Sequence, residues 1–280
     1  MSGATKSVLV TGASKGIGES CALRLARRGW RIFAGYRDPA DAERLRGHGL
    51  EAVPLDITDA GQIEAAARTV EDATGERGLH GVVNNAGIAV AGPLEFLPVA
   101  ALRRQLEINV IGQVAVTQAL MPALRRARGR IVFIGSISGR SALPFTGAYA
   151  ASKYALEAVT DALRIELMPW GLRVAIVEPG VIATPIWETS LGVGEELLSS
   201  MPPEAMVHYG AKMPGLRRRA QRGKQGRDPD DVARAVEHAL TARRPKLRYV
   251  VGTDARVRLG LLLLPTRLRD RLIADVVKRL

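Results

Sequence analysis

The chain has 280 residues, of which 47% are hydrophobic and 24% charged, a composition typical of a globular protein that excludes a wholly disordered one. The formal net charge is +12, and the whole excess lies in residues 212–280, where 19 Lys and Arg residues face seven Asp and Glu residues. A single cysteine, Cys21, excludes an intrachain disulfide and fits a reducing compartment.

The ends of the chain and the histidines bear on location and on metals. The first residues lack the layout of a secretory signal peptide, and the apolar run at residues 259–264 is too short to span a bilayer. We therefore expect a cytoplasmic protein. The four histidines lack metal-ligand spacing, so we expect no metal site.

The chain opens with a strand and a glycine-rich loop. Residues 6–11 form a short apolar run, and Gly12, Gly16 and Gly18 follow before residues 19–28, whose apolar side chains recur at helical spacing. Glycines permit a tight turn and let the backbone approach a pyrophosphate, whose charge a helix N-terminus favours. This context predicts a dinucleotide-binding turn, and a glycine-rich turn without a ligand is the alternative.

The second expected strand, residues 31–37, ends where a dinucleotide-binding fold contacts the adenosine ribose. An acidic residue there would bind the 2′-hydroxyl, whereas Arg37, together with Lys15 of the glycine loop, would accommodate a 2′-phosphate. We therefore expect NADP(H), with NAD(H) less favoured. Asp38 is a rival for the acidic role, but its place before Pro39 favours a turn.

Strands and helices continue to alternate along the chain. Apolar runs predict buried strands at residues 51–57, 81–83, 130–134, 172–177 and 246–252. Helical spacing predicts helices that open at 42–45 and that span 63–74, 102–121 and 228–243. We expect residues 102–121 to form one helix although Asn109, in its middle, disfavours helix; its side chain either lies on the surface or turns inward to hold water or backbone.

A serine, a tyrosine and a lysine follow the strand at residues 130–134. Tyr149 and Lys153 are four residues apart among good helix formers, so they share one face of a helix that reaches about residue 168. A cation beside a phenol lowers its pKa, which suits acid–base work on an alcohol or ketone oxygen. Ser136 lies just past the strand, where open α/β sheets bind ligands. An exposed Tyr and Lys without a function would have the same spacing.

Two segments near the C-terminus are less regular. Residues 184–227 have weak periodicity and contain Trp187, Met201, Met206 and Met213, and we interpret them as a long mobile insertion that closes over substrate. Packing on the sheet edge regardless of ligand is an equal alternative. Residues 256–280 are basic and helical, broken at Pro265.

The basic segment has an apolar stripe with a cationic flank after Pro265. The stripe consists of Leu268, Leu272, Ile273, Val276 and Leu280. That layout is typical of a helix at an anionic lipid surface, so a weak peripheral membrane contact is one hypothesis. Packing of the stripe on the domain, or closure of the substrate pocket, is the favoured alternative. The arginines lack interleaved aromatics, so we do not expect nucleic acid as a partner.

The alternation of strand and helix predicts an α/β fold: a doubly wound parallel sheet, or Rossmann fold, in a single domain over residues 1–280. Five separated motifs agree with one family. The chain resembles the single-domain short-chain dehydrogenases/reductases over residues 6 to about 255. The motifs are Thr11-Gly12-Ala13-Ser14-Lys15-Gly16-Ile17-Gly18, Asp56, Asn84-Asn85-Ala86-Gly87, Asn109, Ser136 with Tyr149 and Lys153, and Pro179-Gly180 with Thr184.

The resemblance implies a role for each of these residues. Tyr149 would be the general acid/base, Lys153 would lower its pKa and bind the nicotinamide ribose, Ser136 would position the substrate oxygen, and Asn109 would hold a water in a proton relay from Lys153. The implied cofactor-binding residues are Gly12, Ser14, Lys15, Gly16, Ile17, Gly18, Arg37, Asp56, Ile57, Asn85, Ala86, Gly87, Tyr149, Lys153, Pro179, Gly180, Ile182 and Thr184.

Residues 148–153 and 161–185 resemble members that act on bulky apolar alcohols and ketones, such as steroid and retinol dehydrogenases. We expect an NADP(H)-dependent oxidoreductase that interconverts an alcohol and its ketone or aldehyde. One alternative is a 3-oxoacyl reductase on carrier-bound substrates. Another, of a different class, is a non-catalytic NADP(H)-binding sensor or scaffold. The resemblance also implies a homodimer or homotetramer assembled through residues 102–121 and 152–168.

Overall fold

The computed structural model describes residues 5–278, without the side chains at 191, 195, 198, 199 and 276–278. Over these residues, seven strands form one parallel sheet in the order β3-β2-β1-β4-β5-β6-β7. The strands are β1 (Ser7–Val10), β2 (Arg31–Tyr36), β3 (Glu51–Pro54), β4 (Gly81–Asn84), β5 (Arg130–Ile134), β6 (Arg173–Pro179) and β7 (Arg248–Val251). The expected doubly wound parallel sheet is confirmed.

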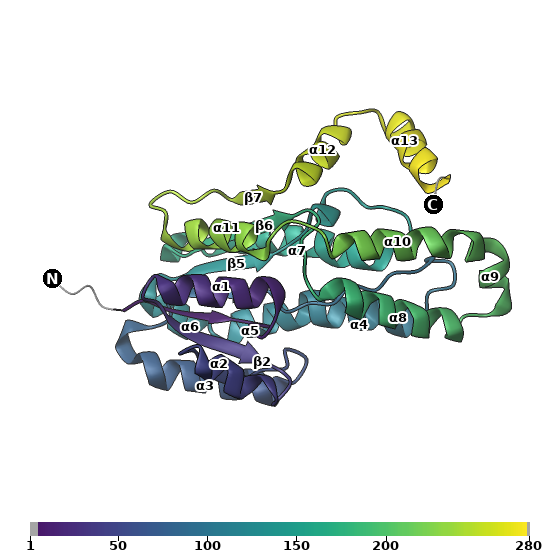
Figure 1. Cartoon of the computed structure of the whole chain (residues 1–280). Helices are drawn as coiled ribbons and strands as arrows, with labels where there is room; N and C mark the ends of the chain where they lie inside the picture. Colours follow the sequence, from purple (N-terminus) through teal and green to yellow (C-terminus); the bar gives the residue numbers. More distant parts are fainter. Residues whose placement is uncertain (1–4, 279–280) are drawn as a thin grey trace.

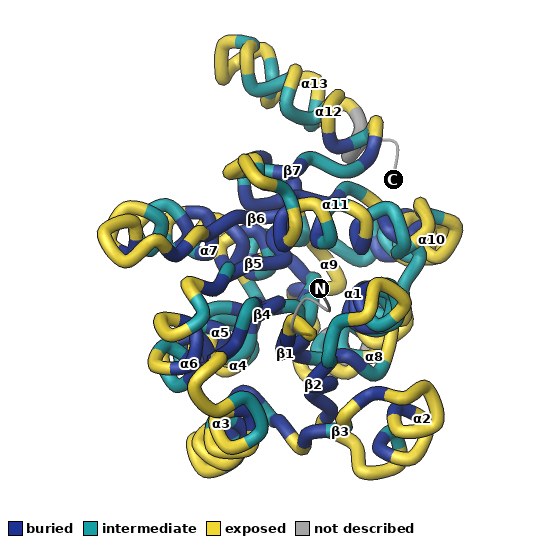
Figure 2. Tube along the Cα trace, turned by 90° about the vertical axis from the view of Figure 1, so that its left-hand side faces the viewer, coloured by how far each residue is buried: buried dark blue, intermediate teal, exposed yellow. Residues whose placement is uncertain are grey.

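Helices cover both faces of the sheet (Figure 1). One face carries α1 (Gly16–Arg27), α2 (Asp41–Gly47) and α11 (Pro229–Thr241), and the other carries α3 (Ala60–Thr74), α5 (Gln113–Ala119), α6 (Met121–Ala127) and α7 (Gly147–Glu166). Figure 2 shows the buried strands between these two layers. Short 3₁₀ turns lie at η1 (Gly75–Arg77), η3 (Ile137–Gly139), η4 (Met168–Trp170) and η5 (Gly210–Lys212).

Strand alternation divides the apolar core in two. Val8 and Val10 of β1 pack with Leu25 on α1, while Leu9 between them points to the other face and packs with Leu124 on α6. Cys21 is buried on α1 as expected. Because both faces of the sheet are covered, the central parts of most strands are apolar, and the carboxyl ends of the strands remain the open edge of the sheet.

The helix expected over residues 102–121 is present as far as Ala119, but it is not a regular α-helix. The chain instead forms α4 (Val99–Leu106), a π-helical turn at Glu107–Gly112, and then α5. Asn109 sits in this turn, fully buried, and its side chain bonds the backbone of Ile88 in both directions. A side chain at Gly112 would collide with the carbonyl of Ile57, so the helix bulges where it passes that strand end.

The insertion at residues 184–227 is helical, which its weak periodicity did not indicate. It contains α8 (Ile186–Ser200), α9 (Pro203–Tyr209) and α10 (Met213–Gly223). Trp187 on α8 lies against Gly223 at the end of α10, so these helices pack largely on one another. Because these helices do not pack on the sheet, their apolar residues need not lie on a single face, which explains the weak periodicity. The capped helix expected from Asp228 is present, since the Asp228 carboxylate accepts from the Asp230 N–H at 2.8 Å.

The basic segment forms α12 (Thr253–Leu261) and α13 (Thr266–Lys278), with the expected break at Pro265. Figures 1 and 2 show α13 standing away from the rest of the domain. Leu268 and Leu272 are 45% and 43% exposed, so the apolar stripe does not pack on the domain over these positions. Its members Val276 and Leu280 lie outside the described side chains. Within residues 5–278, every helix is too short or too polar to cross a membrane.

Candidate active site

A cavity of about 1090 Å³ lies at the carboxyl edge of the sheet. The loops after β1, β4, β5 and β6 form its floor, and α8, α10 and α12 form its outer wall. Ligands of open α/β sheets bind at this edge, where the strand order changes direction. The volume exceeds what one drug-sized ligand needs, so a dinucleotide and a second molecule have room.

The glycine loop meets the requirements of a pyrophosphate site. Gly12 and Gly16 have φ values of +61° and +59°, which favour glycine. Lys15 is the N-cap of α1, and among the described residues no side chain caps the first-turn N–H groups, which leaves them for an anion. Gly18 differs from the expectation: it is buried beneath the loop, where a side chain would collide with the Gly12 carbonyl, and it does not border the cavity.

Asn85 fixes the glycine loop to the end of β4. Its Nδ2 donates to the carbonyls of Thr11 at 2.9 Å and Gly12 at 3.1 Å. The Thr11 hydroxyl in turn accepts from the N–H groups of Asn85 and Ala86, both at 2.9 Å. The side-chain amide of Asn85 therefore holds the loop, although the residue lines the cavity with Ala86 and Gly87.

Basic and acidic residues share the adenosine end of the cavity. Arg37 and Lys15 line it, as do Asp56 and Ile57. Burial opposes ionisation of Asp56, but hydrogen bonds from Thr58 and the charge of Arg37 hold its pKa below the ordinary value. The Asp38 carboxylate accepts from the Ala40 N–H at 3.0 Å, as expected for a turn residue. The exposed Arg37 and Lys15 fit a 2′-phosphate by charge.

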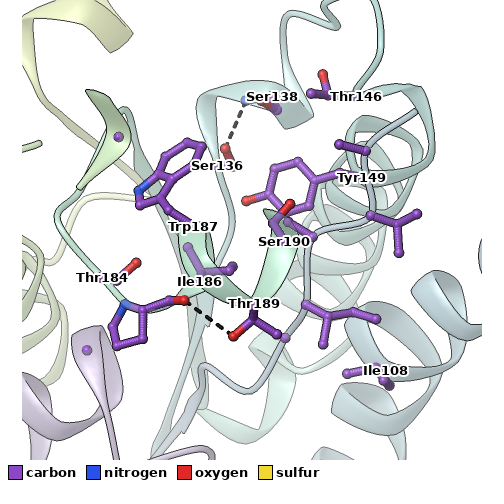
Figure 3. A pocket seen from close by; sticks show the side chains of 18 of the residues that line it. Ile108, Ser136, Ser138, Thr146, Tyr149, Thr184, Ile186, Trp187, Thr189 and Ser190 are labelled. Carbon is purple, nitrogen blue, oxygen red and sulfur yellow. Dashed lines mark hydrogen bonds between the residues drawn. The ribbon is translucent and has the colours of Figure 1, made fainter. Parts of the chain in front are cut away.

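The tyrosine, serine and lysine expected to carry the chemistry meet in the same cavity. Tyr149 and Lys153 come from the first two turns of α7, and Ser136 follows β5. Figure 3 shows the Tyr149 hydroxyl and the Ser136 side chain projecting into the pocket opposite Trp187. The Ser136 hydroxyl accepts from the Ser138 N–H at 3.1 Å, which fixes it at the strand end.

Lys153 lies beside the Tyr149 ring and is held there by the backbone. The Lys153 ammonium donates to the Ile134 carbonyl at 2.8 Å and lies 5.7 Å from the centre of the Tyr149 ring. Burial lowers the pKa of Lys153 to about 8. Burial also raises the pKa of Tyr149, and the Ser136 hydroxyl and the charge of Arg258 oppose that rise. The cation that favours the phenolate here is thus Arg258.

Asn109 does not border the cavity. Its Oδ1 accepts from the Ile88 N–H at 2.9 Å, and its Nδ2 donates to the Ile88 carbonyl at 3.0 Å and to the Ser152 hydroxyl at 3.1 Å. The structure thus shows the backbone-holding alternative. Gln105, which the sequence analysis missed, makes the same kind of clamp to Ile88 and Val90. Both side chains fix the segment after Gly87.

The loop after β6 closes the end of the cavity that is expected to hold the nicotinamide. Pro179, Gly180, Ile182 and Thr184 line it, as expected. The Val181 N–H donates to the Asp254 carboxylate at 2.8 Å, so α12 anchors this loop. A side chain at Gly180 would occupy the space of that carboxylate.

The prediction that residues 184–227 close over the substrate through Trp187 and nearby methionines is supported for only some of these side chains. Trp187 and Met213 line the cavity, together with Ile186. The Trp187 indole N–H donates to the Ile182 carbonyl at 2.7 Å, which fixes the ring over the pocket. Met201 instead packs in a separate apolar cluster, and Met206 is 51% exposed. The weak periodicity of residues 184–227 does not indicate which of these side chains face the cavity.

Fold and site together define a nucleotide-binding oxidoreductase. The sequence model described as short chain dehydrogenase matches residues 6–191. This chain belongs to the short-chain dehydrogenase family, and within it resembles the retinol and steroid dehydrogenases.

Three relatives illustrate the similarity. The chain is 40% identical to human retinol dehydrogenase 5, over 96% of this chain and 86% of that protein. It is 37% identical to bovine 17-beta-hydroxysteroid dehydrogenase type 6, over 96% and 87%. A short chain dehydrogenase from Burkholderia cenocepacia, solved in complex with NADP, superposes with a TM-score of 0.74 at 27% identity, over 96% and 97%.

Proposed function

We propose that this protein is an NADP(H)-dependent oxidoreductase that interconverts a primary or secondary alcohol and its aldehyde or ketone, with a bulky apolar substrate body. The observation that carries the proposal is the meeting of Tyr149 and Ser136 with the glycine loop in one cavity. The apolar lining near Trp187 and the names of the retinol and hydroxysteroid relatives support the substrate class.

A bound nicotinamide would supply hydride transfer at the substrate carbon. The chain supplies the proton: the Tyr149 hydroxyl gives it to the oxygen of a ketone, or takes it from an alcohol. Ser136 orients that oxygen. The Lys153 ammonium, already beside the nicotinamide end, would hold the ribose hydroxyls and replenish the proton of Tyr149.

The cofactor preference rests on charge at the adenosine end. Arg37 and Lys15 line the cavity there, and the neighbour from Burkholderia was solved with NADP. No acidic residue follows β2 directly, because Tyr36 and Arg37 occupy those positions. We infer that the 2′-phosphate of NADP(H) is bound by these two cations.

The experiment is a screen of NADPH oxidation over ketones graded by size, with Tyr149→Phe as the matched variant. That change keeps the ring and removes the proton donor, so turnover should fall by ~10²–10⁴-fold while NADPH binding persists. Turnover by the variant at near wild-type rates would reject the role of Tyr149. NADPH binding without turnover of any ketone or alcohol by the wild type would favour a sensor instead.

A further inference from the structure

Two arginines from distant segments meet at the substrate end of the cavity. Arg219 comes from α10 in the insertion, and Arg258 comes from α12 in the C-terminal segment. Both line the cavity. Arg258 is half-buried, and one of its terminal N–H groups donates to the Ser141 carbonyl. Arg219 is more exposed and lies at the rim.

Neither cation is neutralised by an ion pair. Among the described residues, no carboxylate lies within 4.0 Å of either guanidinium, whereas Arg24, Arg140 and Arg248 each have one. The Nε of Arg258 is buried and finds no hydrogen-bond partner within residues 5–278. Asp254 is the acid that acts on Arg258, and its carboxylate is engaged by the Val181 N–H. A buried donor and charge without partners are costly in the absence of a ligand.

The electrostatics agree with this geometry. Burial and, after it, the charge of Arg219 lower the pKa of Arg258 to about 10, against the opposing effect of Asp254 and the two phenols Tyr149 and Tyr154. The two guanidinium groups are therefore close enough to repel each other. An anion bound in the cavity by both guanidinium groups would relieve that repulsion.

The pair lies beside the reacting groups and away from the adenosine end. Arg258 is close enough to the phenol of Tyr149 to lower its pKa, and the Ser141 carbonyl that it binds belongs to the turn that begins at Ser136. The adenosine end has its own cations, Arg37 and Lys15. The lining also includes the apolar side chains of Leu143, Phe145, Ile186, Trp187 and Met213.

We propose that the substrate has an anionic end, a carboxylate or phosphate, which Arg219 and Arg258 bind while its alcohol or ketone lies at Tyr149. This inference rests on the proposed function and specifies its substrate class: an apolar body with an acidic group at one end. A planar guanidinium donates two parallel N–H groups to such an oxyanion, and a charge-assisted contact of this kind changes binding by about tenfold to a hundredfold.

The test compares keto acids with their methyl esters, using aliphatic skeletons whose spacer between ketone and carboxylate is graded in length. A parallel set replaces the carboxylate with a phosphate monoester. The measured quantity is the ratio of kcat/KM for the anion to that for the ester. We expect this ratio to exceed about ten for the best spacer in the wild type, and the better of the two sets identifies the anion.

The variants are Arg219→Gln and Arg258→Gln, with Arg218→Gln and Arg256→Gln as matched controls. Each control removes the same charge from the same helix at an exposed residue outside the cavity lining. The ratio should fall toward one in the first pair and stay at the wild-type value in the controls. Arg258→Lys, which keeps the charge, should retain part of the preference.

Calorimetric binding of the keto acids and esters to the NADP⁺-saturated protein measures the same preference without turnover. It distinguishes failure of the anion site from failure of the proposed reaction. A ratio near one for every spacer, with neutral ketones still reduced, would overturn the anion site and leave the reaction in place. Weaker NADPH binding in Arg219→Gln, with an unchanged ratio, would assign the cations to the cofactor and overturn the proposal as well.

Discussion

Two buried carboxyl groups behind the active site make the stability of the fold depend on pH. Glu157 lies on α7 one turn after Lys153, and Glu178 lies in β6 next to Pro179; their exposed fractions are 7% and 0%. The Arg248 guanidinium is 3.0 Å from Glu157 and 3.4 Å from Glu178. One oxygen of each carboxyl group is buried and has no partner among the described residues. Burial and the charge of Glu178 raise the pKa of Glu157 to about 7.

The direction of the pH effect follows from that value. A glutamate in the unfolded chain titrates near 4.5, so between pH 4.5 and about 7 the folded state holds a proton that the unfolded state has lost. The contribution of the Glu157 proton to the free energy of unfolding is therefore complete below about pH 4.5, and it is lost as the pH rises through 7. The full difference is on the order of 3 kcal/mol, and most of it falls between pH 5 and pH 8.

The perturbation is Glu157→Gln, which replaces the carboxyl O–H donor with an amide N–H donor and cannot ionise. Between pH 5 and pH 8, the free energy of urea unfolding should fall in the wild type by roughly 2–3 kcal/mol more than in the variant, or about 5 °C in Tm. Glu166→Gln, on the exposed face of the same helix, is the control and should behave as the wild type. Parallel pH dependence of the wild type and Glu157→Gln would refute the raised pKa of Glu157.

Four further predictions concern the cofactor, the insertion, the assembly and the tail. Arg37→Gln should weaken NADPH binding by about tenfold or more and spare NADH, and equal wild-type affinity for both cofactors would exclude the 2′-phosphate site. Residues 184–227 should become resistant to protease when cofactor and a substrate analogue bind, and unchanged cleavage at saturation counts against a lid. Exposed Ile111 and Ile165 on the expected interface helices predict a homo-oligomer, which a monomer mass by light scattering at micromolar concentration would contradict. Exposed Leu263 and Leu272 on the basic tail predict co-sedimentation with anionic vesicles at low salt, and binding unaffected by removal of residues 256–280 would disprove this role.

Much of the fold could be predicted because it is encoded locally. Val8 and Val10 alternate with Leu9 on a strand, and Gly12 and Gly16 must adopt positive φ at the turn that follows. The same holds for Tyr149 and Lys153, whose spacing on a helix places them on one face whatever surrounds them. These features need only neighbouring residues to be recognised.

The missed features depend on contacts between distant segments. The break at Asn109 arises because its amide meets Ile88, which lies 21 residues earlier. The contact between Arg258 and the Ser141 carbonyl spans 117 residues. Periodicity reports which face of a helix is apolar, but it does not report which loop a polar side chain will meet. The only available signal was the basic excess after residue 212, which indicated charge without a location.

The position of Arg258 links substrate charge to the acidity of Tyr149. In the free enzyme, the guanidinium lowers the pKa of the phenol and so favours the phenolate, the form that takes a proton from an alcohol. An anion bound to Arg258 would cancel that charge and shift the phenol toward its protonated form, which is the form that a ketone needs as proton donor. The C-terminal segment would thus contribute to both substrate selection and proton transfer, although its charge lies outside the Tyr149 and Lys153 motif.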